Sequence, residues 1–69
     1  MRFLSVNLDC FLIELESLEE TMAVHYCLKQ AQHHHINELI PAARSILVYF
    51  DPLLVEMHTL IRWISSQKI

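Results

Sequence analysis

Three consecutive histidines, His33, His34 and His35, are the residues whose type best suits metal binding in this chain. A metal site needs ligands that converge on one point, whereas consecutive residues at the end of a helix fan apart. Neither a Cys-x-x-Cys pair nor a His-x-x-x-His pair accompanies them. We therefore interpret the three histidines as a polar turn between a helix and a strand, and their capacity to take up nickel or zinc stays open.

Two further sets of side chains could carry chemistry. Glu14 and Glu16 alternate on one face of a strand pattern, but general acid–base work needs one carboxyl perturbed by burial or by a close partner. The polar helix start that follows favours solvated charges. Cys27 would need a base such as His25, and on a helix these two residues point in different directions. We expect Cys10 and Cys27 to be reduced thiols that pack as small apolar side chains.

The sequence contains no glycine. A loop that cradles phosphate needs glycine for close backbone approach and positive φ, so neither a P-loop nor a dinucleotide fingerprint is possible. We expect this chain to bind no cofactor, and any ATP to be bound by another chain or domain.

Charge and length restrict the partners. Five Lys/Arg against eight Asp/Glu give a formal net charge of −3 with no basic run, which disfavours nucleic acid. Apolar stretches such as Ser45 to Phe50 are too short to span a bilayer. The opening Met1-Arg2-Phe3 does not resemble a secretory signal, so we expect a cytoplasmic protein with no membrane partner.

The 69 residues are expected to form one domain, and 54% of them are apolar. A core of this size cannot absorb so many apolar side chains. Some apolar surface should therefore stay exposed and mark a contact with a partner.

Alternating apolar residues predict the strands. Phe11, Ile13 and Leu15 share one face of a strand over Cys10 to Glu16, and a shorter strand over Arg2 to Val6 precedes it.

A second pair of strands is predicted further along the chain. A strand over Ile36 to Ile40 turns at Pro41 to Arg44 into the clearest strand, Ser45 to Phe50, in which Ile46, Val48 and Phe50 share a face. The short connection predicts a hairpin.

The first helix begins at a capping box, Ser17-Leu18-Glu19-Glu20, and is predicted to run to about Gln32. Its spacing predicts a core stripe of Val24, Cys27, Leu28 and Ala31. A second apolar stripe lies on a different side and consists of Leu18, Met22 and Tyr26.

The last helix is predicted to begin with Asp51 as N-cap and Pro52 in the first turn. Trp63 lies off its apolar stripe, which suits either an anchor at the edge of the core or an interface residue. The predicted stripe consists of Leu53, Met57, Leu60, Ile61 and Ile64.

These elements predict an α+β domain of order ββαββα, a ferredoxin-like variant with two helices on one face of an antiparallel sheet. The opposite face is expected to carry Leu39 among other apolar side chains. We predict that excess apolar surface forms an interface made of Leu18, Met22 and Tyr26 on the helix and Leu12, Leu47 and Tyr49 on the sheet.

Met1 to Leu4, Phe11 to Leu15 and above all Asn37 to Pro52 resemble the amino-terminal domain of the B-type component of 5-oxoprolinase. The family is also named allophanate hydrolase subunit 1, carboxyltransferase subdomain C and D, or the sporulation-kinase inhibitor KipI. The resemblance covers nearly the whole chain, and its family-pattern positions are Glu38, Pro41, Arg44, Asp51 and Pro52. This chain departs from the family in lacking glycine at two turns, near Asn7 to Asp9 and at His34-His35.

The resemblance implies one component of an ATP-dependent enzyme that opens a cyclic amide, 5-oxoproline, together with a partner similar to the C-type component of 5-oxoprolinase. Family members continue into a second, cyclophilin-like β-domain, which is not among these 69 residues. The isolated chain is therefore expected to be inactive, and its catalytic residues are unknown. An alternative implied by the KipI branch is a regulatory module that binds and inhibits a histidine kinase. Self-association into a homo-oligomer is a further expectation.

Overall fold

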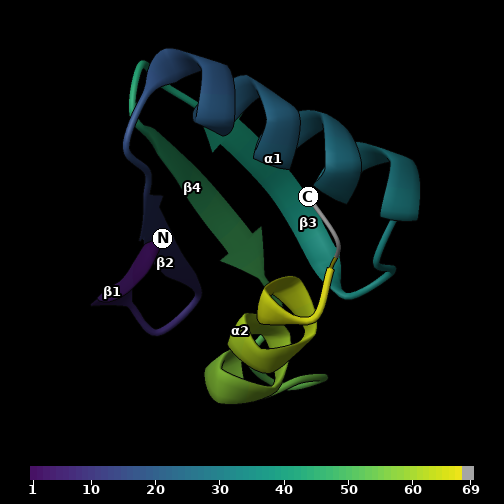
Figure 1. Cartoon of the computed structure of the whole chain (residues 1–69). Coiled ribbons are helices and arrows are strands. Elements are labelled where there is room, and N and C mark those ends of the chain that lie inside the picture. The colour runs from purple at the N-terminus through teal and green to yellow at the C-terminus, as the bar shows by residue number, and fades with distance from the viewer. Residues whose placement is uncertain (68–69) are drawn as a thin grey trace.

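Two β-hairpins form the sheet of this protein (Figure 1). The computed structural model describes residues 1–67, in which β1 (Arg2–Asn7) pairs with β2 (Cys10–Glu14) and β3 (Ile36–Pro41) pairs with β4 (Ser45–Phe50). Strand β2 also pairs with β4, so the order is β1-β2-β4-β3 and every neighbouring pair is antiparallel. The predicted hairpins and the predicted α+β class are confirmed.

The two helices are α1 (Leu18–Ala31) and α2 (Met57–Ser65), and both cover the same face of the sheet (Figure 1). Since β2 and β3 are each antiparallel to β4, they are parallel to one another, and α1 connects them. This is the split β-α-β unit of ferredoxin-like folds. The ββαββα order with both helices on one face is therefore as predicted.

The core lies between this sheet face and the helices. Phe11 and Ile13 of β2 and Ile46 and Val48 of β4 have no exposed surface, which confirms the predicted inward faces. The ring of Phe11 lies 6.3 Å from that of Phe3 and 5.8 Å from that of Phe50, in tilted arrangements. The helices complete the core with Val24, Leu28, Leu60 and Ile64.

The start of α1 follows the local sequence signal. The Ser17 Oγ accepts a hydrogen bond from the Glu20 backbone N–H at 3.1 Å, and the Glu20 Oε1 accepts one from the Glu16 N–H at 3.3 Å. These bonds satisfy amides that have no partner inside the helix. The helix ends at Ala31, one residue before the predicted end, because Gln32 adopts a left-handed conformation with φ 49°.

The core stripe of α1 differs in part from the predicted one. Val24 and Leu28 are buried as expected, but Cys27 is half-buried and Ala31 is exposed. Thr21 replaces them on the core face, and its hydroxyl donates to the Ser17 carbonyl at 2.8 Å. Because this bond satisfies the hydroxyl, a polar residue can be buried where the apolar pattern alone did not place one.

The predicted start of the last helix is wrong. Asp51 does not cap α2; its Oδ1 accepts from the Leu53 N–H at 2.9 Å and closes a turn, and α2 begins after Glu56. An aspartate followed by proline suits a turn as well as a helix N-terminus. Leu53, expected in the core stripe, is 92% exposed, whereas Leu60 and Ile64 are buried as predicted.

A β-bulge in β3 corrects the expected position of Leu39. Ile36 pairs with Phe50 and Glu38 with Tyr49, so Asn37 is an extra residue in the strand. The bulge reverses the alternation after Asn37 and places Leu39 against the core instead of on the open face.

Candidate functional site

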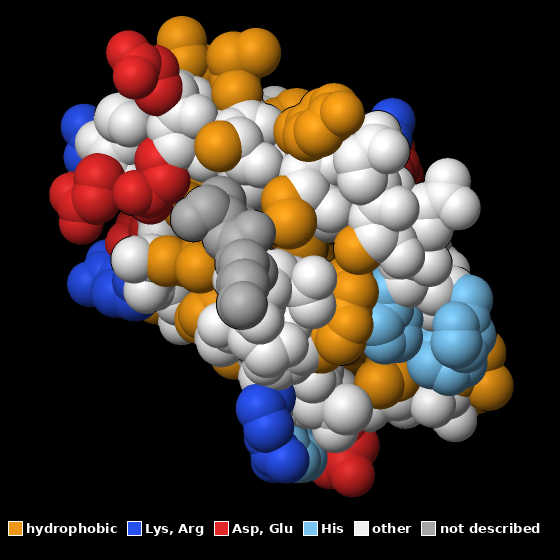
Figure 2. All heavy atoms as spheres, turned by 45° about the vertical axis from the view of Figure 1, so that its right-hand side comes forward, with side chains coloured by type: hydrophobic (Ala, Val, Ile, Leu, Met, Phe, Trp, Pro, Cys, Tyr) orange, Lys and Arg blue, Asp and Glu red, His pale blue; other side chains and the backbone are white. Residues whose placement is uncertain are grey.

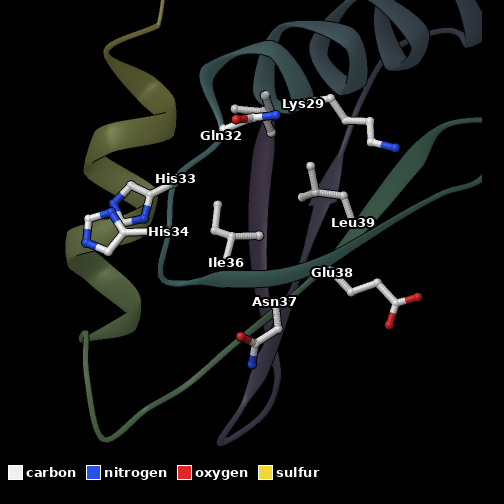
Figure 3. Close-up of a pocket in the computed structure, with 9 residues that line it drawn as sticks. Lys29, Gln32, His33, His34, Ile36, Asn37, Glu38 and Leu39 are labelled. Carbon is white, nitrogen blue, oxygen red and sulfur yellow. The ribbon is translucent and has the colours of Figure 1, made fainter.

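A groove of about 610 Å³ lies between the end of α1 and β3 (Figure 3). Its floor is apolar and consists of Leu28, Ile36 and Leu39. Polar side chains surround this floor: His33 and His34 lie together at one end, and Lys29 and Glu38 lie toward the other (Figure 3). An apolar floor with a few polar groups is the usual composition of a binding site for a small molecule or a peptide side chain.

The left-handed turn at Gln32 determines the position of the three histidines. Their ring centroids lie 5.4 Å apart for His33 and His34, 5.6 Å for His33 and His35, and 4.1 Å for His34 and His35. The expectation that these side chains fan apart is therefore wrong. The helix has ended before them, and the turn brings together three rings that a continuing helix would separate.

His33 connects this turn to the last helix. Its ring meets the edge of Trp63 on α2 in a T-shaped arrangement at 4.7 Å, and its Nδ1 accepts a hydrogen bond from the His35 backbone N–H at 3.1 Å. Burial, and secondarily the neighbouring His34 and His35, lowers the pKa of His33 below the ordinary value of 6.5. The neutral ring is thus the form that this turn accommodates.

Trp63 forms the edge of the core. It is partly buried against the core residues while its ring contacts His33. This confirms the interpretation of Trp63 as an anchor at the edge of the core. It also links α2 to the turn that follows α1.

The three histidines do not form a metal centre by themselves. Within residues 1–67, no group of three or more His, Cys, Asp or Glu side chains is arranged to hold a metal ion. The His35 Nδ1 is buried without a hydrogen-bond partner. The histidines are close, but closeness of rings alone does not direct their nitrogens toward one point.

Lowering the pH should loosen this turn. The folded pKa of His33 lies below its unfolded value, so the unfolded chain binds the proton more tightly. The stability that the neutral ring contributes is full above about pH 6.5 and is lost as the pH falls through the folded pKa. Thermal unfolding followed between neutral pH and about pH 5 should show a decline in Tm that His33→Gln reduces.

His58→Gln is the matched control, because His58 is an exposed residue on α2. The His58→Gln variant should retain most of the decline in Tm between neutral pH and about pH 5. A ring-proton NMR titration that placed the pKa of His33 above 6.5 would contradict this prediction.

The carboxylates and thiols considered for catalysis are not arranged as a catalytic site. Glu14 forms an ion pair with Arg2 across the β1–β2 hairpin, and Glu16 is exposed to solvent. Cys10 is buried and Cys27 half-buried, and both are free thiols. These positions agree with the structural interpretation of both sets.

The predicted helix stripe of Leu18, Met22 and Tyr26 lies on the outer side of α1, and all three side chains are exposed. Val24 and Leu28 occupy the core face of α1, so none of the three stripe residues packs in the core. The role of the stripe as an interface stays a prediction.

The predicted sheet residues Leu12, Leu47 and Tyr49 are half-buried on the open face, opposite the helices. The strand register adds two residues to them. Leu4 pairs with Leu12, Leu12 with Leu47, and Leu47 with Ile40, so that one aliphatic row crosses all four strands. Ile40 joins this row because of the bulge at Asn37. The alternation of Arg2 to Val6 could have indicated Leu4.

Most of the family-pattern positions lie in strand pairs, backbone hydrogen bonds and turns of the fold. Glu38 lies beside Tyr49 in the register, Pro41 ends β3, and the Arg44 carbonyl accepts from the Leu15 N–H at 2.9 Å. Asp51 closes the turn described above, in which Pro52 is exposed. Glu38 alone among them lines the groove.

The sequence pattern of the family described as carboxyltransferase domain, subdomain C and D, matches residues 1–68. The chain belongs to this family. The match covers the whole sheet and both helices of this carboxyltransferase subdomain C and D protein, and it confirms the resemblance. A search of curated protein sequences with this chain finds no match.

A crystal structure of a conserved uncharacterized protein, PH0987 from Pyrococcus horikoshii, is similar to this carboxyltransferase subdomain C and D protein, with a TM-score of 0.79 at 20% sequence identity. The similarity covers 93% of this chain and 32% of that one, so this chain spans about a third of its length. It demonstrates a shared fold. No helix within residues 1–67 has the length and apolar character needed to cross a membrane.

Proposed function

We propose that this chain acts as a docking domain, without catalytic activity of its own, in an ATP-dependent amide hydrolase of the 5-oxoprolinase or allophanate hydrolase type. Membership of the carboxyltransferase subdomain C and D family supports this proposal. The proposed substrate of the assembled enzyme is a cyclic amide such as 5-oxoproline. The proposed partner is a protein similar to the C-type component of 5-oxoprolinase.

The observation that carries the proposal is the aliphatic row on the open sheet face, formed by Leu4, Leu12, Leu47 and Ile40. When helices cover one face of an antiparallel sheet, the other face is commonly polar and solvated. A continuous aliphatic row on that second face is typical of a surface that an assembly covers. We infer that the remainder of the enzyme packs against this row.

The absence of glycine from this chain indicates which part of the enzyme binds ATP. Because the chain has no glycine, it contains neither of the glycine-rich loops that cradle phosphate groups. We assign ATP binding to another part of the enzyme, and we expect the isolated chain neither to hydrolyse ATP nor to open 5-oxoproline.

Co-expression with the C-type component from the same genome tests this proposal. The two proteins should co-sediment, and Leu47→Asp should weaken their association at least about tenfold, because a carboxylate would be desolvated in the contact. Leu53→Asp is the matched control: it makes the same change on an exposed loop residue and should leave the association unchanged.

Three results would count against the proposal. Turnover of 5-oxoproline or ATP by the purified chain alone would exclude a non-catalytic domain. Equal effects of Leu47→Asp and Leu53→Asp would exclude the open face as the contact. Inhibition of histidine-kinase autophosphorylation, with no binding to the C-type component, would favour the KipI-like regulatory function instead.

A further inference from the structure

The outer side of α1 is a second apolar surface, separate from the open sheet face. Leu18, Met22 and Tyr26 are 55%, 63% and 68% exposed, and their spacing of four residues places them along one side of the helix. The core residues of α1 lie on the other side. Figure 2 shows hydrophobic side chains along the top of the molecule, where α1 lies.

The edges of the sheet are poorly suited to pairing with another copy. Both edge strands, β1 and β3, carry a register shift, between Ser5 and Asn7 and between Ile36 and Glu38. Bulges of this kind twist an edge away from a partner strand and prevent a continuous ladder of hydrogen bonds. Association through α1 does not depend on these edges.

The charges of α1 are divided between its two ends. Glu19 and Glu20 lie in its first turn, and Lys29 lies in its last turn. In Figure 2, acidic side chains gather at one end of this surface, with basic side chains beside them, and a further basic side chain lies near the other end. Two copies of this helix in antiparallel orientation bring the acidic end of each toward the basic end of the other, whereas a parallel pair would oppose like charges.

We propose that two copies of this chain associate through α1 in antiparallel orientation. With the two-fold axis between Met22 and Tyr26, the Tyr26 ring of one copy packs on the partner's Met22, a favourable contact between thioether and aromatic ring. Lys29 of each copy then lies toward the acidic first turn of the other. The open sheet face stays accessible in this dimer.

The seam is small. A single pair of helices contributes less than the roughly 800 Å² per partner of a standard interface. The dimer is therefore weak and concentration-dependent, and it weakens further as added salt screens the end charges.

Charge reversal tests the orientation of the dimer. Lys29→Glu and Glu19→Lys each place like charges against each other in the homodimer, and each variant alone should self-associate at least about tenfold more weakly than the unmodified chain. An equimolar mixture of the two variants should form a heterodimer, because each contact then joins opposite charges. Analytical ultracentrifugation measures the association constants of the unmodified chain, of each variant and of their mixture.

A second pair of variants keeps the test independent of charge. Tyr26→Ser should weaken self-association at least about tenfold, whereas Leu53→Ser, the same kind of change at an exposed residue outside α1, should not. Far-UV circular dichroism verifies that every variant is folded.

Each outcome of these self-association experiments either supports or overturns the proposed dimer. A dimer that both single variants lose and that their mixture restores supports the proposal. An unmodified chain that stays monomeric at its highest soluble concentration overturns it. A mixture that stays monomeric overturns the antiparallel orientation, and a dimer that tolerates Tyr26→Ser overturns the α1 contact.

Discussion

Truncation of Phe11 to alanine should remove a large share of the free energy of unfolding of this domain. The Phe11 side chain has no exposed surface, and its ring lies between those of Phe3 and Phe50. Phe→Ala in a packed core costs about 3–5 kcal/mol, because the transfer free energy is lost and a cavity remains. A chain of 69 residues has a total unfolding free energy of roughly 3–10 kcal/mol, so this one change removes a large share of it.

Urea unfolding followed by circular dichroism measures this loss. Leu53→Ala is the matched control, since Leu53 is 92% exposed, and it should shift the free energy of unfolding by no more than about 0.5 kcal/mol. A loss below about 1 kcal/mol for Phe11→Ala would contradict the tightly packed core described above.

Replacing two neighbouring residues of β4 by aspartate should have opposite outcomes. Val48 has no exposed surface and faces the helices, so Val48→Asp would bury an unpaired carboxylate. Such a charge costs several kcal/mol, enough to unfold a domain of this size. Leu47 is half-buried on the open face, where water reaches a carboxylate, so Leu47→Asp should remain folded.

Urea unfolding of both variants compares the two faces of the sheet directly. The expected result is a cooperative transition for Leu47→Asp and none for Val48→Asp. Equal losses of stability would mean that the open face is itself part of the core of the isolated chain. That result would also remove the aliphatic row from the proposed contact with the rest of the enzyme.

These two surfaces can be separated by mutation. Leu47→Asp is expected to fold and to lose the C-type component, whereas Tyr26→Ser is expected to fold and to lose self-association. If the open face and α1 are independent surfaces, each variant should retain the interaction that the other loses. The domain would then contribute two contacts to an assembly while its core stays unchanged.

Local sequence signals determined much of the fold. The alternation of Phe11, Ile13 and Leu15, and that of Ile46, Val48 and Phe50, specified both the strands and their buried faces. A period-two pattern allows only one buried face, so no tertiary information was needed. The capping box at Ser17 likewise predicted the start of α1, because its bonds are made within four residues.

Sequence signals were insufficient where one local motif suits two structures. Asp51-Pro52 is compatible with a helix start and with a turn, and packing selects the turn that brings Leu60 and Ile64 into the core. In β3, the alternation alone predicted the wrong face for Leu39. The bulge at Asn37, which depends on pairing with β4, exchanged Leu39 and Ile40 between the two faces.

The candidate site shows the same division. The sequence identified the three histidines, the α1 stripe and half of the aliphatic row, because residue type and spacing are visible in the chain. Only the tertiary structure placed His33 against Trp63 and brought Ile40 into the row, whereas the alternation of the first strand could have indicated Leu4. The contact of His33 with Trp63 joins residues that are far apart in the chain, and the place of Ile40 in the row depends on the bulge in the pairing of β3 with β4. Helix packing and strand register set these positions, and no local pattern encodes them.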